Sequence, residues 1–295
     1  MNGHVTVLLR GGLANQMFQY ALALALAEKC RGQAVVDTAD VDRDAKRDYA
    51  LGLCNPPPQR VSTTGRCLLR AARSTPLWNL CGSRWSAMLP GGPRIIREQG
   101  NAFDPRVLSL SGALILDGYW QSEEYFKHCR PLIKQTFDWT ATASPEVCES
   151  LVRAIETPGS VAVHVRRGDY ICEPSANAFH GVCDLDYYRR AAGIVGEHVV
   201  DPHFFIFSDD IDWAETNLVL PGKQTYVRHA RPTSPHVDMW LMSRCEHAII
   251  ANSSYSWWAA WLTERSGKCT VAPRRWFRAP HMQSITPVPA RWHVT

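Results

Sequence analysis

The stretch "VAVHVRRGDY" (residues 161–170) alternates small apolar residues with others and then ends in two arginines, a glycine and an aspartate. Side chains alternate between the two faces of a β-strand, which would place Val161, Val163 and Val165 on one face and His164 and Arg166 on the other. The sequence therefore predicts a strand over 161–165, with Arg167 and Asp169 on the turn that follows.

Further apolar runs follow this stretch at regular intervals. They occupy 161–165, 203–207, 224–227, 247–251 and 269–272, and stretches with helical patterns near 184–199, 210–218, 235–245 and 256–266 lie between them. Strands that alternate with helices are typical of a doubly wound parallel sheet. Ligands of such sheets bind beyond the carboxyl ends of the strands, so the residues after each run are the candidate site.

The N-terminal half also predicts an α/β domain. "HVTVLLR" (4–10) and "AVVD" (34–37) have strand patterns and flank an alanine- and leucine-rich helix over 14–30. A chain of 295 residues is long enough for two domains, which we place at 1–150 and 151–295.

The segments between these two halves are less regular. A strand over 113–120 precedes a helix that we expect to break at Pro131, and Ser144-Pro145-Glu146 predicts the start of a linker helix. Residues 53–93 contain several loop signals and are the least regular part of the chain.

Composition excludes some classes of protein. A content of 45% hydrophobic residues is typical of a globular protein. The net charge of +4 is too small to indicate binding of nucleic acid. The 10 cysteines are scattered without zinc-ligand spacing, which favours a reducing compartment. No apolar run is long enough to span a membrane, and we expect a soluble cytoplasmic protein.

The first strand end places Arg166 and Arg167 where a ligand would lie. A guanidinium group can hold a phosphate through two parallel hydrogen bonds. The alternative is an ion pair with Asp169 or another carboxylate. His164, taken alone, is more typical of a core histidine.

The second strand end carries Ser208, Asp209 and Asp210. A carboxylate there can accept the paired N–H donors of guanine, whereas the alternative is that the aspartates, Asp210 or Asp212 among them, cap the next helix.

The third strand end offers hydroxyl and amide groups at the start of a helix. A helix N-terminus with Asn252, Ser253, Ser254 and Ser256 would bind an anion without a net charge. The nearby Trp257, Trp258 and Trp261 have helical spacing and indicate core packing.

A glycine turn, "RGGLANQ" (10–16), joins the first strand to the first helix. It lacks the residues of a P-loop and the third glycine of a dinucleotide fingerprint. Its glycines allow close approach of the backbone to a ligand, and we expect Asn15 and Gln16 to face an interdomain cleft.

In combination these segments resemble the bacterial α-1,2-fucosyltransferases. The resemblance rests on "GGLANQMFQYA" (11–21), "GYWQSEEYF" (118–126), "HVRRGDY" (164–170), "FSDD" (207–210), "DMWLMSRCEHAIIANSSYSWWAAWL" (238–262) and "APRRW" (272–276). The chain departs from the family pattern mainly in residues 53–93 and in residues 171–183, which we expect to form a loop.

The resemblance implies a GT-B architecture, in which two Rossmann-type domains face a central cleft. Residues 1–150 would lie mainly on the acceptor side and residues 151–295 would bind GDP-fucose. It further implies inverting transfer of L-fucose from GDP-β-L-fucose to the 2-hydroxyl of a galactose-type acceptor, without a metal or other cofactor. The expected acceptor is a galactose-terminated or lipid-linked glycan of the bacterial surface. We expect the protein to associate transiently with the inner face of the membrane to reach it, without a membrane anchor.

Roles for individual residues also follow from the resemblance. Arg166 would hold the β-phosphate with Arg167 assisting it or supporting the loop, and His164 and Asp209 would recognise guanine or ribose. Ser253, Ser254 and Ser256 would bind the pyrophosphate, and Asn15 would reach the fucose or β-phosphate from the other domain.

The general base is open among four acidic residues. It must reach the acceptor hydroxyl, and Asp169 and Glu173 follow the arginines directly, with Asp184 and Asp186 slightly further on. Asp169 can instead support an arginine.

Two other functions remain open. Asp40-Val41-Asp42, Asp184-Leu185-Asp186 and Ser208-Asp209-Asp210 resemble the metal-binding motif of a GT-A-type nucleotide-sugar transferase. A non-catalytic module that binds nucleotide or glycan is the other alternative.

Overall fold

A computed structural model describes residues 4–73, 86–88, 92–231, 233–263 and 265–295. The chain divides into two compact units, unit 1 (Met1–Asp138) and unit 2 (Trp139–Thr295). The sequence placed this division between residues 150 and 151. It falls earlier because α5 (Thr140–Ala143) and α6 (Glu149–Ile155) pack against α11 (Pro235–Arg244) of unit 2.

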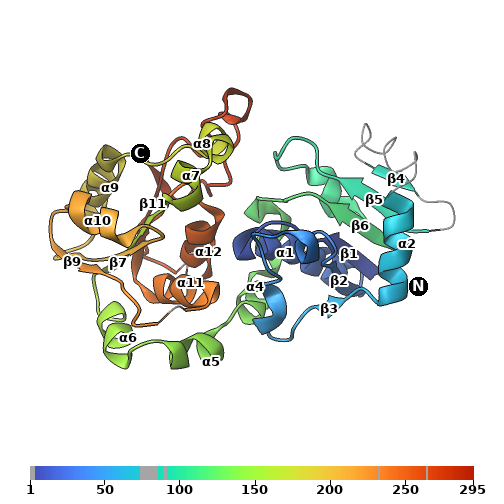
Figure 1. The fold of residues 1–295 in the computed structure, drawn as a ribbon, viewed down its shortest axis with the longest axis horizontal. Coiled ribbons are helices and arrows are strands. Elements are labelled where there is room, and N and C mark those ends of the chain that lie inside the picture. The colour runs from blue at the N-terminus through green and yellow to red at the C-terminus, as the bar shows by residue number, and fades with distance from the viewer. Residues whose placement is uncertain (1–3, 74–85, 89–91, 232, 264) are drawn as a thin grey trace. The chain divides into compact units, whose positions relative to one another are not determined.

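Unit 1 contains a six-stranded sheet with helices (Figure 1). The strand order is β3-β2-β1-β6-β5-β4, and neighbouring strands are parallel except for β4 and β5. The strands are β1 (His4–Leu8), β2 (Gln33–Asp37), β3 (Gln59–Arg60), β4 (Ser86–Met88), β5 (Arg94–Arg97) and β6 (Leu114–Asp117). The helices are α1 (Leu13–Lys29), α2 (Thr63–Arg73) and α4 (Arg130–Thr136).

Helix α1 forms where the sequence predicts it, because alanine and leucine have high helix propensity. The chain turns out of β1 through Gly11, whose φ of 73° favours glycine, and the helix then packs on β1 and β2. Most of its residues are buried, including the polar Gln16 and Gln19.

Unit 2 contains a fully parallel sheet of six strands in the order β12-β11-β10-β7-β8-β9. The strands are β7 (Ser160–Val165), β8 (His203–Ser208), β9 (Lys223–Tyr226), β10 (His247–Ile249), β11 (Thr270–Ala272) and β12 (His293–Val294). Numbered from β7, this is the order 3-2-1-4-5-6 of a Rossmann-type sheet. Its topological switch point lies between β7 and β10.

Helices cover both faces of this sheet (Figure 1). Helices α9 (Leu185–His198) and α10 (Ile211–Asn217) pack on the face formed by Val161, Val163 and Val165. Helices α11 and α12 (Ser254–Leu262) pack together on the other face. The indoles of Trp257, Trp258 and Trp261 are completely buried, which confirms their predicted role in the core.

Several local predictions were wrong. Residues 171–183 were expected to form a loop, but most of them belong to α7 (Gly168–Cys172) and α8 (Pro174–His180). The segment before Pro131 forms 3₁₀ turns instead of a helix, and α4 begins at Arg130 with the proline in its first turn. Ser144–Glu146 is also a 3₁₀ turn, and α6 begins later. Of the irregular stretch 53–93, residues 74–85 and 89–91 lie outside the described residues.

Candidate active site

The predicted strand ends meet at the switch point of unit 2. Strands β7 and β10 are neighbours, so the chain leaving β7 with Arg166 adjoins the chain leaving β10 toward Ser253. Strand β8 lies on the other side of β7 and delivers Asp209 to the same edge. Ligands of doubly wound sheets bind outside this kind of edge. The structure therefore brings together residues that the sequence could only place on separate strands.

The guanidinium group of Arg166 lies between two carboxylates. Its Nη2 is 2.6 Å from Oδ1 of Asp169, and its Nη1 is 2.9 Å from Oδ2 of Asp209. The ring of Tyr170 lies beneath it, with the guanidinium carbon 5.4 Å from the ring centroid. The ion pair that the sequence left as an alternative is therefore present. A guanidinium has five N–H donors, so two carboxylates do not exhaust its capacity to bind an anion.

Arg167 fastens the loop after β7 to the loop after β8. Its backbone N–H donates to Oδ1 of Asp209 at 2.8 Å, and its Nε donates to Oδ2 of Asp210 at 3.1 Å. The guanidinium group stacks on Trp213, 3.5 Å from the ring centroid. These contacts favour the supporting role for Arg167 over direct contact with a ligand.

Asp209 is the shared partner of both arginines. A Cβ atom at Gly168 would lie 2.6 Å from its Oδ2, so the close approach of Asp209 requires a glycine there. Asp210, in contrast, caps α10 by accepting the N–H of Trp213, as the capping alternative predicted. Asp212 does not cap the helix but pairs with Arg228. The proposed contact between Asp209 and guanine stays a prediction.

His164 is buried, with 5% of its surface exposed, and its ring lies against Tyr255 at a centroid distance of 5.6 Å. Burial lowers its pKa to about 3, and the charge of Arg166 adds to the effect. The imidazole is therefore neutral at physiological pH. Its buried Nδ1 has no hydrogen-bond partner within the described part of the chain.

The three serines at the start of α12 differ in their surroundings. Ser253 caps the helix by accepting the N–H of Tyr255. Ser256 is 1% exposed and its hydroxyl donates to the carbonyl of Ser253, so the hydroxyl points into the protein. Ser254 is partly exposed. An anion at this helix N-terminus would mainly meet backbone N–H groups and the Ser254 side chain.

Asn252 has a structural contact set. Its buried amide donates to the carbonyls of His180, Gly181 and Trp276. It thereby ties the end of β10 to α8 and to the segment after β11.

The four candidate bases separate clearly in the structure. Asp184 caps α9 by accepting the N–H of Tyr187 at 2.7 Å, and Asp186 is exposed and pairs with Arg189. Asp169 pairs with Arg166. Glu173 is partly exposed at the N-cap position of α8. The geometry thus gives Asp184 and Asp186 structural contacts and leaves Asp169 and Glu173 at the edge where a ligand would bind.

The aspartates that resembled a metal motif also face arginines. Both oxygens of Asp40 accept hydrogen bonds from Arg73, at 2.9 and 2.8 Å, and Asp42 pairs with Arg60 and Arg66. Such contacts are typical of structural ion pairs, and they give no support to the metal-dependent alternative.

Asn15 is the predicted site residue of unit 1. It lies in the first turn of α1, and its Oδ1 accepts a hydrogen bond of 2.8 Å from Nε2 of Gln121. The sequence predicted that Gln16 faces a cleft, and this prediction was wrong because its side chain is completely buried. Its amide group is fully paired: Nε2 donates to the carbonyls of Gly11 and Asp48, and Oε1 accepts the N–H of Ala50.

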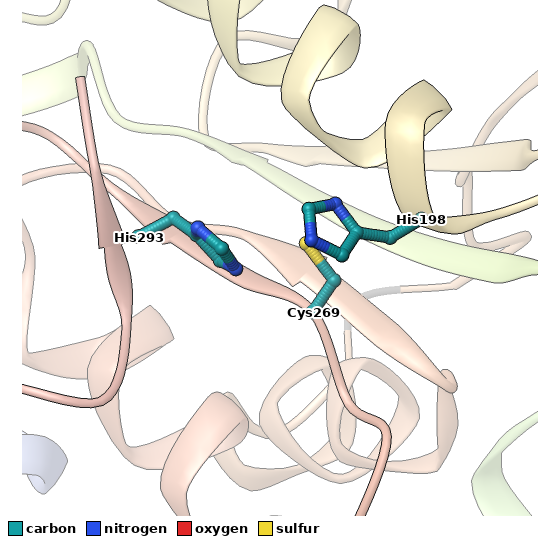
Figure 2. A group of neighbouring side chains, drawn as sticks. All are labelled: His198, Cys269 and His293. Carbon is teal, nitrogen blue, oxygen red and sulfur yellow. The ribbon is translucent and has the colours of Figure 1, made fainter.

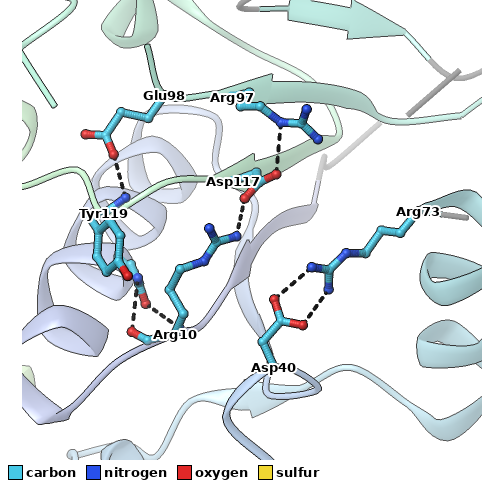
Figure 3. Close-up of polar contacts among 8 residues, drawn as sticks. Arg10, Asp40, Arg73, Arg97, Glu98, Asp117 and Tyr119 are labelled. Carbon is cyan, nitrogen blue, oxygen red and sulfur yellow. Dashed lines mark hydrogen bonds and ion pairs between the residues drawn. The ribbon is translucent and has the colours of Figure 1, made fainter. Parts of the chain in front are cut away.

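A network that the sequence did not predict lies at the carboxyl edge of the unit 1 sheet (Figure 3). Asp117, at the end of β6, pairs with Arg10 after β1 and with Arg97 at the end of β5. Glu98 accepts the N–H groups of Tyr119 at 2.6 Å and Trp120 at 2.9 Å. Burial raises the pKa of the Glu98 carboxyl, although the two backbone donors oppose the effect.

Glu98 thereby holds the turn that leads to Gln121, the partner of Asn15. The available sequence signal was Arg10, the last residue of the predicted strand over 4–10. Asp117 lay within the strand expected over 113–120, and nothing in the sequence indicated that Glu98 binds this turn.

Helices able to span a membrane are not found in the described ranges, since none of them combines sufficient length with sufficient apolarity.

Comparison with known proteins shows which family the sequence is similar to. The sequence model of the family described as "Glycosyl transferase family 11" matches residues 99–292. An alpha-1,2-colitosyltransferase of Escherichia coli is 31% identical over 298 residues, covering 98% of this chain and 97% of that protein. The O-antigen biosynthesis glycosyltransferase WbnK of the same species is also 31% identical, with coverage of 94% and 96%. Galactoside 2-alpha-L-fucosyltransferase Sec1 of Mus musculus is 26% identical, with coverage of 88% and 65%.

A solved structure shows a similar fold. Arabidopsis thaliana FUT1, determined in complex with GDP, aligns with a TM-score of 0.51 at 12% sequence identity, covering 92% of this chain and 70% of that one. The likeness concerns the fold alone, and together with the two largely parallel sheets it confirms the predicted GT-B-like α/β class.

Proposed function

The chain belongs to glycosyl transferase family 11, and on this basis we propose that it transfers L-fucose from GDP-β-L-fucose to the 2-hydroxyl of a galactose-type acceptor. The donor has a β-linked sugar and the product an α-1,2 linkage, so the reaction is a single displacement with inversion. No metal is required in this proposal, because a fixed guanidinium group supplies the positive charge.

The observation on which the proposal rests is the position of Arg166. It follows β7 directly at the switch point of the 3-2-1-4-5-6 sheet, beside the N-terminus of α12. Negative charge develops on the departing GDP as the bond to fucose breaks. Preorganised donors at such a position stabilise the transition state more than the ground state, which is the main source of electrostatic catalysis.

The two carboxylates beside Arg166 fit this role. Asp169 and Asp209 hold the guanidinium group in one orientation before the donor arrives, so little reorganisation is needed when the charge develops. Asp169 then acts mainly by positioning Arg166. Glu173, partly exposed at the start of α8, is the better candidate for the general base that takes the proton of the acceptor hydroxyl.

The nucleotide is proposed to lie against His164 and the start of α12. A neutral imidazole can donate from one nitrogen and accept at the other, as a base or ribose hydroxyl requires. The first turn of α12 offers backbone N–H groups to the pyrophosphate, as in other parallel-sheet nucleotide sites.

The names of the relatives suggest a second sugar donor besides GDP-fucose. The E. coli relative is named a colitosyltransferase, and colitose is L-fucose without its 3-hydroxyl group. A site that hydrogen-bonds that hydroxyl rejects the deoxy sugar by about 10⁴–10⁵-fold, whereas a site without such a contact accepts both. Turnover of GDP-colitose but not of GDP-fucose would show that colitose is the sugar transferred, and the proposed mechanism would then apply to that donor.

The test is a donor and acceptor screen in buffer that contains EDTA. We expect GDP release with GDP-fucose and a β-galactoside, and an α-1,2 linkage in the product by NMR. Abolition by EDTA with rescue by Mn²⁺ would contradict the metal-free mechanism. Binding of GDP-fucose without GDP release in the presence of any β-galactoside of a broad panel would instead support a binding module. A panel that includes lipid-linked galactosides also tests the proposed peripheral encounter with a membrane acceptor.

A further inference from the structure

Three side chains that can bind a metal ion meet at the amino-terminal edge of the unit 2 sheet (Figure 2). His198 is the last residue of α9, Cys269 precedes β11, and His293 begins β12. Their ligand atoms all lie within 4.8 Å of one another. The three residues are far apart in the sequence, which explains why cysteine and histidine spacing gave no sign of the cluster.

The strand register explains why these side chains converge. His293 pairs with Val271 in the parallel ladder of β11 and β12. Cys269 lies two residues before Val271, so its side chain points to the same face of the sheet. Cys269 and Val271 belong to the core that α9 covers, and the last residue of α9 is His198. The cluster is thus produced by the fold itself.

Hydrogen bonds around the cluster leave the side chains ready to bind. Nδ1 of His198 lies 2.8 Å from the carbonyl oxygen of Ile194, which can only accept, so in the neutral ring Nδ1 carries the proton and Nε2 is the atom that can bind a metal ion. Figure 2 shows one ring nitrogen of His198 toward the sulfur of Cys269. A carbonyl partner on the second nitrogen is typical of metal-binding histidines. The backbone N–H of Cys269 donates to Nδ1 of His247 at 3.0 Å and fixes the position of the cysteine.

The donor set suits zinc. One thiolate and two imidazoles are ligands that Zn²⁺ prefers, at about 2.3 Å for sulfur and about 2.0–2.1 Å for nitrogen. In a tetrahedral site these lengths place ligand atoms roughly 3.5 Å apart. The imidazoles of His198 and His293 are on exposed residues, so they can close the remaining distance of about 1 Å by side-chain rotation.

We propose that His198, Cys269 and His293 form a binding site for a thiophilic divalent ion such as Zn²⁺, with water as the fourth ligand. The ion would join β12 to β11 and to the end of α9, and the thiol proton would pass to solvent on binding. The cluster lies at the opposite edge of the sheet from Arg166, since it involves the amino-terminal ends of β11 and β12. The ion therefore stabilises unit 2 and takes no part in fucosyl transfer. This inference does not depend on the proposed function.

The test begins with the full chain, freed of metal by EDTA and dialysis. Titration with Co²⁺ should produce the thiolate-to-cobalt charge-transfer band in the near ultraviolet, and calorimetry with Zn²⁺ should give one site per chain. Zn²⁺ at about 100 times its Kd should raise Tm by roughly 5–10 °C. His198→Ala and His293→Ala replace exposed residues, so both should fold, weaken binding at least about tenfold and lose the Tm shift.

His281→Ala, an exposed histidine of unit 2 outside the cluster, is the matched control and should bind as the unaltered chain does. Cys269→Ala should abolish the cobalt band. If that variant does not fold because the residue is buried, the two histidine variants still decide the question. A cobalt band and Tm shift that persist in both histidine variants, or the absence of any band in the unaltered protein, would overturn the proposal.

Discussion

Oδ2 of Asp209 lies 2.9 Å from Nη1 of Arg166, and this contact joins the ends of two neighbouring strands. Asp209→Asn keeps an oxygen for the N–H of Arg167 but removes the charge that orients Arg166. A hydrogen bond to a charged group contributes about 1.5–3 kcal/mol, so kcat/KM for GDP-fucose should fall about 10–100-fold. Steady-state kinetics check this. Asp186→Asn, which alters an exposed ion pair on α9, should leave kcat/KM unchanged. Equal kinetics for both variants would contradict the role of Asp209.

Gly168 makes the same contact possible. A methyl group at this position would lie 2.6 Å from Oδ2 of Asp209, and we expect the carboxylate to turn away from Arg166 to relieve the clash. Gly168→Ala should therefore lower kcat/KM at least about tenfold while the protein stays folded, as judged by circular dichroism.

The control for that variant is Gly193→Ala in α9, where the added methyl group meets no atom within 4 Å. We expect unchanged kinetics, because this position is remote from Asp209. The higher helix propensity of alanine should increase the free energy of unfolding by up to about 1 kcal/mol. Normal activity of Gly168→Ala would show that the position of Asp209 does not matter for turnover.

His164 should make stability depend on pH. Its pKa is lowered from 6.5 to about 3 by burial and by Arg166, so the unfolded chain binds this proton first as the pH falls. The free energy of unfolding that the neutral His164 contributes is fully present above pH 6.5 and is lost progressively as the pH falls toward 3. Between pH 6.5 and pH 4.5 this loss amounts to about 2–3 kcal/mol.

Urea unfolding of the unaltered protein and of His164→Gln at pH 7 and pH 4.5 measures this contribution. Other histidines titrate in both proteins and cancel in the comparison. The variant should lose less free energy of unfolding between the two pH values than the unaltered protein. Identical losses would mean that His164 is not buried as a neutral imidazole.

Glu98 should stabilise unit 1 through the turn at Tyr119 and Trp120. Glu98→Gln leaves an amide N–H₂ facing at least one backbone N–H, so the free energy of unfolding should fall by about 1–3 kcal/mol. Glu149→Gln alters an exposed pair with Arg153 and should change it by less than about 0.5 kcal/mol. Chemical denaturation distinguishes the two, and equal stabilities would refute the role of Glu98.

The sequence predicted the central strands β7 and β8 of unit 2 well because they are mainly apolar and buried. The run at 203–207 corresponds to β8 and the run at 161–165 to β7, within a residue at either end. Helices α7 and α8 escaped prediction because their residues show no apolar face, and β12 did so because it has only two residues.

Side-chain pairing was the part that the sequence could not settle. Arg167 and Asp209 are 42 positions apart, and only the parallel pairing of β7 with β8 brings them into contact. The sequence therefore left Arg166 between an anion site and an ion pair. In the structure Arg166 forms ion pairs that orient its guanidinium group, and a guanidinium group oriented in this way can still bind an anion. Ser256 shows a second limit of sequence analysis. It belongs to a motif of serines that predicted an anion site, but its hydroxyl points into the protein.

The most direct test of the account is the turnover number of Arg166→Ala with GDP-fucose and a β-galactoside in the presence of EDTA. Loss of one preorganised donor to the leaving group should reduce kcat by about 10²–10³-fold or more. Arg189→Ala, an exposed arginine of α9, should keep full activity. Turnover of Arg166→Ala close to that of the unaltered enzyme, in a folded protein, would contradict the claim that Arg166 supplies the charge for departure of GDP.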